Sequence, residues 1–190
     1  MPEITGILLA AGLSRRFGSD KRLHQLADGR PLALAAAIAL QAGVDRTLAV
    51  LRPEDAPLTQ MLADAGLQPV ICPQADIGMG ASIACGVRAS QDARGWLIAL
   101  ADMPFIQPNT IRLIADNLRQ GVPLVAPSHQ GRRGHPVGFG PQFRKDLLAL
   151  DTDSGARAIL QAHPELLTVL AVDDPGVLQD IDTPADLSSA

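Results

Sequence analysis

The sequence predicts a single α/β domain in which a mostly parallel sheet is covered by helices on both faces. Strand-like and helix-like segments alternate along the chain, which favours a parallel sheet with helical crossovers. Residues 96–101 are almost continuously apolar, as is typical of a strand buried on both faces. The 190 residues suffice to bury a sizeable core, and no repeat or linker divides them. We therefore expect one domain over residues 1–190.

In the first half, apolar runs with glycine or proline at their ends mark the expected elements. The helix at 31–41 has Pro31 at its start and Gly43 after its end. A second helix, at 56–65, is ended by Gly66. In chain order we expect a strand at Ile4–Leu9, a helix at Pro31–Gln41, a strand at Arg46–Leu51, a helix at Ala56–Ala65, a strand at Gln68–Cys72, a helix at Gly80–Ala89 and a strand at Trp96–Ala101.

In the second half the pattern is less regular after Gly131. We expect a helix at Thr110–Arg119, strands at Leu124–Ala126 and Pro136–Gly140, helices at Gln142–Leu150 and Gly155–Ala162, and a strand at Leu167–Val172. Thr183, followed by Pro184 and an acid at 186, has the form of a helix N-terminus. Ligands of parallel sheets bind at the carboxyl ends of strands, so polar residues there are the first candidates for a site.

Composition excludes several classes of protein. Hydrophobic residues make up 47% of the chain and charged residues 19%, which indicates a globular protein. A net charge of −4 argues against a general nucleic-acid binder, so any positive potential is local, and residues 15–22 are the obvious place for it. Neither a signal peptide nor a membrane span is evident, so we expect a cytoplasmic protein without a membrane partner. Cys72 and Cys85 lack metal-ligand spacing and are expected to be reduced, buried thiols.

The most informative segment is ITGILLAAGLSRRFGSDK, residues 4–21. A buried strand ends in small residues, and a glycine-bearing turn there lets backbone N–H groups approach an anion. Arg15, Arg16 and Lys21 supply positive charge close by. The segment is neither a P-loop nor a Gly-x-Gly-x-x-Gly turn. It indicates phosphate binding, and the alternative is an ordinary strand-to-loop junction with solvated basic residues.

Carboxylates follow two strand-like segments. Asp102 comes directly after the strand at 96–101, where an acid can ligate Mg²⁺, although an aspartate that only begins a turn is common there. Asp180 and Asp182 lie on one side of an extended segment, because side chains alternate along it. One of the two could therefore face a metal ion while neighbouring backbone holds the other. The alternative is that these acids only favour the dipole of the helix that follows.

Three further segments carry candidate ligand-binding residues. Gly78-Met79-Gly80-Ala81-Ser82 would let a flat ligand approach the backbone at a helix start, or is simply a loop before a capped helix. In Arg132-Arg133-Gly134-His135-Pro136-Val137 the arginines could hold a phosphate and His135 could orient a substrate, although a lone histidine is more often structural. Asp153-Ser154-Gly155-Ala156-Arg157 has the form of a helix cap, with Asp153 or Ser154 as the capping residue.

Together these motifs resemble those of the MobA-like NTP transferases, and most closely the molybdenum cofactor cytidylyltransferases. The matching patterns are L-A-A-G-x-S-x-R-F-G-x-x-K, G-M-G-x-S, D-M-P, R-G-H-P-V-G-F, D-x-G-A-R and D-I-D-T-P-x-D, in the expected order over nearly the whole chain. The resemblance implies a three-layer, Rossmann-like nucleotidyltransferase fold. It also implies a Mg²⁺-dependent transfer of CMP from CTP to the phosphate of molybdopterin, with release of pyrophosphate.

The resemblance assigns roles residue by residue. It implies catalytic roles for Arg16, Lys21 and Asp102, and Mg²⁺ ligation by Asp102 and Asp182. It implies acceptor binding by Arg133, His135, Asp153 and Arg157. Nucleotide binding is expected from Leu9, Ala10, Ala11, Gly12, Ser14, Arg15, Gly78, Gly80 and Ser82. The nucleotide-binding half would cover about residues 1–105 and the acceptor-binding half about residues 106–190.

The identity of the base and of the acceptor stays open. Ala11 favours CTP, because cytidylyl enzymes of the family tend to have L-A-A-G where guanylyl enzymes have L-A-G-G, but the Gly18–Lys21 spacing fits either. One alternative is another nucleotidyltransferase, using GTP or a sugar or lactyl phosphate acceptor. The other is a non-catalytic factor that delivers cofactor to a molybdenum hydroxylase apoenzyme, itself a possible partner. The intact Arg16, Lys21, Asp102 and Asp182 argue against that second alternative.

Overall fold

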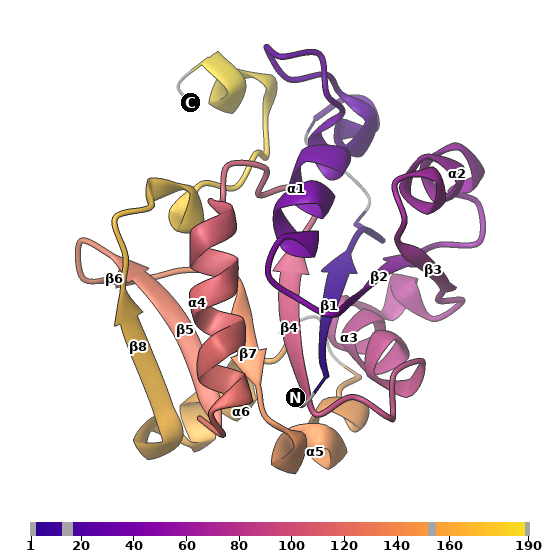
Figure 1. Cartoon of the computed structure of the whole chain (residues 1–190). Helices are drawn as coiled ribbons and strands as arrows, with labels where there is room; N and C mark the ends of the chain where they lie inside the picture. Colours follow the sequence, from indigo (N-terminus) through magenta and orange to yellow (C-terminus); the bar gives the residue numbers. More distant parts are fainter. Residues whose placement is uncertain (1–2, 13–16, 152–154, 189–190) are drawn as a thin grey trace.

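A computed structural model describes residues 3–12, 17–151 and 155–188, and over these residues the chain forms one α/β domain (Figure 1). The predicted fold class is confirmed. Eight strands in the described part form one sheet in the order β3-β2-β1-β4-β7-β5-β6, with β8 paired to β5. The strands are β1 Ile4–Leu9, β2 Arg46–Leu51, β3 Gln68–Ile71, β4 Gly95–Leu100, β5 Leu124–His129, β6 Arg132–Arg133, β7 Val137–Phe139 and β8 Leu167–Ala171.

The strand order reverses direction at β1, and this positions the site. The chain runs outward from β1 to β2 and β3, then returns to β4 on the other side of β1, and all these neighbours pair in parallel. Leu9, at the end of β1, pairs with Val50 of β2 and with Leu100 of β4. β7 is antiparallel to both β4 and β5. A crevice is expected at such a reversal, beyond the carboxyl ends of β1 and β4.

Helices cover both faces of the sheet. Alternate residues of β1 face opposite layers, because Leu8 packs in one hydrophobic cluster and Ile7 in another. The first cluster includes residues of α1 Leu32–Gln41, α2 Ala56–Asp64 and α4 Pro108–Arg119, and the second includes residues of α3 Met79–Arg88, α5 Arg144–Leu148 and α6 Arg157–Ala162. The result is a helix–sheet–helix sandwich (Figure 1). None of the helices in the described residues is long and apolar enough to cross a membrane.

Close packing of α3 on the sheet requires a glycine. A Cβ atom at Gly86 would lie 2.7 Å from Cγ2 of Ile7, which is closer than side-chain packing allows. With no side chain at Gly86, the α3 backbone approaches β1, and the first turn of α3 comes to lie at the carboxyl edge of the sheet. Short 3-10 helices occupy connections at Lys21–Leu23, Ala75–Ile77, Pro141–Phe143, Pro164–Leu166, Pro175–Leu178 and Pro184–Ser188.

The structure corrects several expected boundaries in the second half. β5 extends to His129 instead of ending at Ala126, because Ser128 and His129 pair with β6, a strand that was not expected. The helix expected at 142–150 is split into a 3-10 turn followed by the short α5, since helix N-termini often tighten into 3-10 geometry. The helix expected from Gly155 begins at Arg157. Gly155 has a φ of +58°, which does not continue a right-handed helix.

Candidate nucleotide site

A cavity of about 540 Å³ opens at the carboxyl ends of β1 and β4, where the strand order reverses. Residues far apart in the sequence meet there: the end of β1, the first 3-10 helix, the start of α3, the end of β4 and the C-terminal segment. The lining residues are Leu9, Ala10, Ala11, Gly12, Lys21, Arg22, Ala75, Asp76, Ile77, Gly78, Met79, Ser82, Leu100, Ala101, Asp102 and Asp182.

Lys21 joins two carboxylates in this cavity. Its Nζ donates hydrogen bonds to Oδ2 of Asp102 at 2.9 Å, to Oδ1 of Asp182 at 3.1 Å and to the carbonyl of Ile181 at 2.7 Å. Only 8% of Lys21 is exposed. Burial alone would lower the pKa of Lys21, but the carboxylates of Asp102 and Asp182 outweigh it and raise this pKa above its ordinary value. The ammonium is therefore charged at neutral pH.

A turn in the C-terminal segment holds Asp182 opposite Asp102. The backbone N–H of Ile181 donates to the Asp102 carbonyl at 2.9 Å, which ties the segment to the end of β4. Asp186 accepts hydrogen bonds from the backbone N–H groups of Asp182 and Thr183, and from the Thr183 hydroxyl. The expected helix start is present as the 3-10 helix Pro184–Ser188. Hydrogen bonds from Thr183 and Asp182 lower the pKa of Asp186, so this acid stays ionised and accepts them.

The oxygen atoms around Lys21 fit a hard divalent cation. Oδ1 of Asp102 is buried and has no hydrogen-bond partner among the described residues. Asp102, Asp182 and the Ile181 carbonyl together offer the oxygen donors that Mg²⁺ and Mn²⁺ prefer. The described residues contain no group of three or more His, Cys, Asp or Glu side chains that could hold a metal alone. A cation here would thus keep water or take ligands from a substrate.

The start of α3 forms the opposite wall. Gly78 precedes the helix with a φ of 145°, and Ser82 is buried in the first turn. Ile77 and Met79 line the cavity and are 56% and 39% exposed. Exposed apolar side chains beside a glycine offer a surface on which a flat aromatic ligand can lie.

His135 does not line the cavity, but it lies close enough to Asp102 for the two to interact electrostatically. A Cβ atom at Gly134 would lie 2.1 Å from the Val177 carbonyl oxygen, and the His135 N–H donates to that same carbonyl at 2.9 Å. The connection between β6 and β7 is thereby held against the 3-10 helix at 175–178. Nδ1 of His135 is buried without a hydrogen-bond partner among the described residues. Burial lowers the pKa of His135, only partly offset by Asp102, so the ring is neutral at pH 7.

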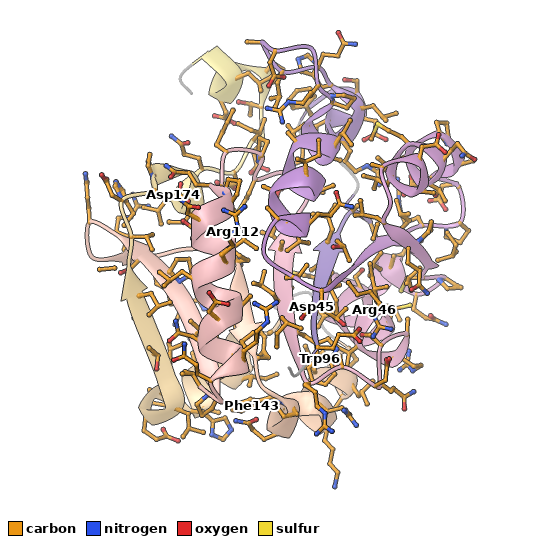
Figure 2. All side chains as sticks on the ribbon, viewed as in Figure 1. Asp45, Arg46, Trp96, Arg112, Phe143 and Asp174 are labelled. Carbon is orange, nitrogen blue, oxygen red and sulfur yellow. The ribbon has the colours of Figure 1, made fainter. Side chains whose placement is uncertain are left out.

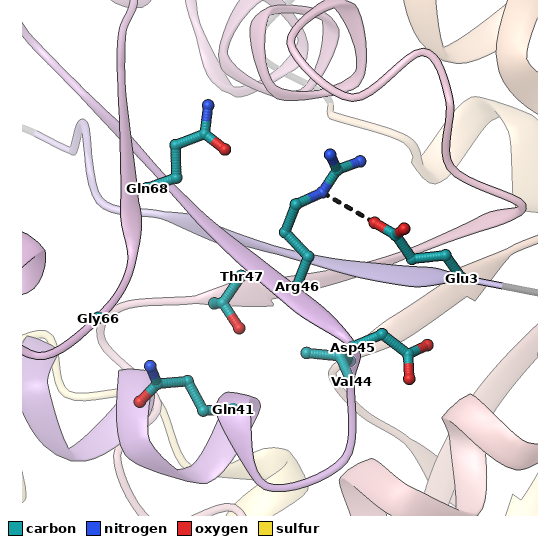
Figure 3. Close-up of a pocket in the computed structure, with 8 residues that line it drawn as sticks. All are labelled: Glu3, Gln41, Val44, Asp45, Arg46, Thr47, Gly66 and Gln68. Atoms are coloured by element: carbon teal, nitrogen blue, oxygen red, sulfur yellow. Dashed lines mark ion pairs between the residues drawn. The ribbon is translucent and has the colours of Figure 1, made fainter.

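A second cavity, of about 590 Å³, lies at the opposite edge of the sheet (Figure 3). Its lining comes from the residues that precede or begin β1, β2 and β3. Its Arg46 forms ion pairs with Glu3 at 3.0 Å and with Asp92 at 2.8 Å. The amino ends of parallel strands are not where ligands of such sheets bind, and this shallow, charge-paired hollow holds no candidate chemistry.

Comparison with known proteins identifies the family of the chain. The family description "MobA-like NTP transferase domain" matches residues 6–169. The chain belongs to the MobA-like NTP transferase family. The matched residues include Ala11 and Gly12 after β1, the start of α3 and Asp102 after β4, all of which line the cavity, whereas Asp182 lies beyond the match.

Individual relatives of this NTP transferase cover almost its whole length. Purine catabolism protein PucB of Bacillus subtilis is 32% identical, over 97% of this chain and 94% of PucB. Nicotine blue oxidoreductase of Paenarthrobacter nicotinovorans is 28% identical, over 96% of this chain and 94% of that protein.

Among solved structures, Rv0371c of Mycobacterium tuberculosis H37Rv superposes with a TM-score of 0.84 at 28% identity, covering 99% of this chain and 96% of the other. A structure of the same mycobacterial protein in complex with manganese superposes with a TM-score of 0.80 at 26% identity, covering 98% and 97%.

The structure brings only part of the predicted site together. Lys21, Asp102 and Asp182 are in contact, and they share the cavity with Leu9, Ala10, Ala11, Gly12, Gly78 and Ser82. Gly80 is buried in the first turn of α3. Arg133 and Arg157 are exposed and do not line the cavity. Ser14, Arg15, Arg16 and Asp153 lie outside the described residues.

Two features of the NTP transferase site were not predicted. One is the contact of Lys21 with Asp102 and Asp182, the two carboxylates that were expected to hold a metal ion. Lys21 had been expected to contact phosphate. The other is the buried pair of Arg22 and Asp55, of which Arg22 lines the cavity. Arg22 belongs to the basic segment recognised in the sequence, but its partner lies 33 residues further along the chain. No local pattern reveals such a pairing.

Proposed function

We propose that this protein is a Mg²⁺-dependent cytidylyltransferase that transfers CMP from CTP to the terminal phosphate of molybdopterin. The observation that carries the proposal is the convergence of Lys21, Asp102 and Asp182 beside the L-A-A-G loop, in one cavity large enough for a nucleotide. Nucleotide transfer needs positive charge and metal-binding carboxylates near the phosphates. In this cavity Lys21 can supply the positive charge, and Asp102 and Asp182 are the carboxylates.

In the proposed reaction, an oxygen of the acceptor phosphate attacks the α-phosphorus of CTP. A new P–O bond forms there, the bond to the bridging oxygen of the β-phosphate breaks, and pyrophosphate leaves with the electron pair. The acceptor already carries an ionised phosphate, so no protein nucleophile is required. The chain's task is to align the two phosphates and to stabilise charge that grows on the leaving group.

The residues of the cavity divide this task. The backbone after β1, at Ala11 and Gly12, would face the triphosphate. Lys21 would neutralise charge on the departing pyrophosphate, together with Arg16, which lies outside the described residues. Asp102 and Asp182 would hold the metal ion, which supplies Lewis-acid neutralisation of the phosphate oxygens when bound. The manganese complex of the related Rv0371c supports a divalent metal in this fold.

The acceptor would lie on the side of His135. A neutral imidazole beside Asp102 can donate one hydrogen bond and accept another without adding charge next to the metal ligands. Arg133, Asp153 and Arg157 would complete the acceptor side. This division gives a nucleotide-binding half of about residues 1–105 and an acceptor-binding half of about residues 106–190.

The test is pyrophosphate release from each of CTP, GTP, ATP and UTP, with molybdopterin as acceptor and with Mg²⁺ or Mn²⁺ present. We expect turnover with CTP, its loss in EDTA, and its loss in Asp102→Asn. Asp146→Asn, which changes an exposed carboxylate on α5, is the matched control and should retain turnover. A preference for GTP would replace the cytidylyl assignment by a guanylyl one. Failure with every nucleotide would reject transferase activity toward molybdopterin.

A further inference from the structure

Arg22 is a buried arginine whose five N–H groups all have partners. Nε and one Nη2 hydrogen donate to the two oxygens of Asp20, at 2.7 and 2.8 Å. Nη1 and Nη2 each donate to one oxygen of Asp55 at 2.7 Å. The remaining Nη1 hydrogen goes to the carbonyl of Ala10. Only 4% of Arg22 is exposed, so these bonds are shielded from water.

This saturation excludes a direct role for Arg22 in phosphate binding. A guanidinium has five N–H donors, and here none is left for a ligand. The surrounding charge is also balanced, because Asp55 accepts further hydrogen bonds from the backbone N–H and the guanidinium of Arg52. Burial alone would raise the pKa of Asp55, but its bonds from Arg22 and Arg52 lower it, so the carboxylate stays ionised. The cluster therefore fixes the position of the cavity wall and adds little net charge to the cavity.

Two of the three partners of Arg22 stand at the ends of the loop that is proposed to bind the triphosphate. Ala10 stands at its start, directly after β1, and Asp20 stands at its end, directly before Lys21. Asp55 lies outside the loop, at the start of α2, and accepts hydrogen bonds from Arg52, which directly follows β2. Arg22 therefore joins both ends of the loop to the connection between β2 and α2.

The bond to Ala10 also sets the direction of a backbone N–H. The Ala10–Ala11 peptide is trans, because the cis bond found in the described chain is His135–Pro136. In a trans peptide the C=O and the N–H point to opposite sides. With the Ala10 carbonyl directed at the guanidinium, the N–H of Ala11 points away from it.

We propose that Arg22, held by Asp55, is the positioning residue that directs the Ala11 N–H toward the triphosphate. This rests on the proposed function, because the loop must bind a nucleoside triphosphate for its direction to matter. Arg22 acts through the loop backbone and touches no substrate.

The chain contains its own control for this idea. Asp28 and Arg30 repeat the local geometry of Asp20 and Arg22: the arginine N–H and Nε each donate to the aspartate two residues earlier, as does Nη2. Arg30, however, is 48% exposed at its side chain and pairs with no second acid among the described residues. Arg30→Lys therefore makes the same chemical change without touching the loop.

The experiment compares Arg22→Lys, Asp55→Asn and Arg30→Lys with the wild type. Titration calorimetry measures binding of Mg²⁺–CTP and of inorganic tripolyphosphate, which lacks a base. ¹⁵N–¹H spectra of the same samples follow the Ala11 amide with and without tripolyphosphate. Circular dichroism at the working temperature confirms that each variant is folded, and Asp55→Asn carries the test if Arg22→Lys does not fold.

We expect Arg22→Lys and Asp55→Asn to weaken binding of both probes, and to lower kcat/KM by about 10–100-fold, as misplacement of a reacting group by about 1 Å does. The Ala11 amide signal should shift on tripolyphosphate binding in the wild type and in Arg30→Lys, and lose that shift in the other two variants. Folded variants with wild-type binding and an unchanged Ala11 shift would overturn the positioning role alone. A wild type that binds neither probe would overturn the proposed function and the positioning role together.

Discussion

The ammonium of Lys21 lies 2.9 Å from Oδ2 of Asp102, at the end of β4, and 3.1 Å from Oδ1 of Asp182 in the C-terminal segment. The two carboxylates are those proposed to hold a divalent metal, and Lys21 supplies positive charge to both of them. A metal ion and the ammonium repel each other across this short distance. A triphosphate can remove the conflict, because its negative charge attracts the lysine away from the carboxylates.

Lys21→Met should therefore increase the affinity of the nucleotide-free protein for Mn²⁺. We expect a change of about tenfold, corresponding to ~1.4 kcal/mol, because the competing charge is gone while both carboxylates remain. Electron paramagnetic resonance of added Mn²⁺ measures the bound fraction directly. Arg30→Met removes an exposed cation and should leave Mn²⁺ binding unchanged. Equal or weaker Mn²⁺ binding in Lys21→Met would show that Lys21 does not compete with the metal.

Ala11→Gly should relax the preference for CTP over GTP. Ala11 lines the cavity in the loop after β1, and removal of its methyl group leaves more room beside a purine. One methyl group shifts discrimination by about 1–3 kcal/mol at most, so we expect a partial change. The measurement is kcat/KM for each nucleotide with molybdopterin as acceptor. An unchanged ratio would exclude Ala11 as the cause of base selection and direct attention to the residues at 78–82.

Asp174→Ala should destabilise the fold through the N-terminus of α4. Asp174 is 1% exposed and accepts hydrogen bonds from the Thr110 hydroxyl at 2.6 Å and from the Gln107 N–H at 2.9 Å, at the beginning of that helix (Figure 2). Its removal leaves buried donors unpaired, which costs about 1–3 kcal/mol. Urea unfolding followed by circular dichroism measures the loss. The neighbouring Asp173 is exposed, and Asp173→Ala should change the free energy of unfolding little.

Cys85 should react slowly with iodoacetamide at pH 8. The fold brings Cys72, which follows β3, close to Cys85 of α3. The Cys72 thiol lies 3.8 Å from the Ala81 carbonyl of α3, and the Cys85 thiol lies 3.8 Å from the Ile71 carbonyl of β3. Burial, with a contribution from Cys72, raises the pKa of Cys85 to about 12. A raised thiol pKa means that the unreactive neutral form dominates below that pH.

The labelling rate of Cys85 should accordingly rise about tenfold per pH unit between pH 7 and pH 10. Mass spectrometry of peptides measures it, and urea-unfolded protein, in which the pKa is ordinary, is the reference. A rate that levels off near pH 9 in the folded protein would contradict the raised pKa.

Much of this fold could be predicted because it depends on local patterns. For the strands at 4–9 and 46–51 the predicted boundaries equal the observed ones, because buried strands form nearly continuous apolar runs. The same alternation of strands and helices predicted that the site lies at the carboxyl ends of the parallel strands. The short β6 could not be found, because two exposed arginines carry no apolar signal and become a strand only by pairing with Ser128 and His129.

The sequence by itself determined the fold class, the family and the three residues Lys21, Asp102 and Asp182 as neighbours of one site. These follow from hydrophobic periodicity and from short motifs, which are local properties of the chain. Only the tertiary structure decided their partners. Lys21 binds the carboxylates because the fold places Asp102, 81 positions further along the chain, beside it, and Arg22 is buried because the fold places Asp55 beside it. Charge pairing of this kind depends on distance in space, and distance along the chain does not determine it.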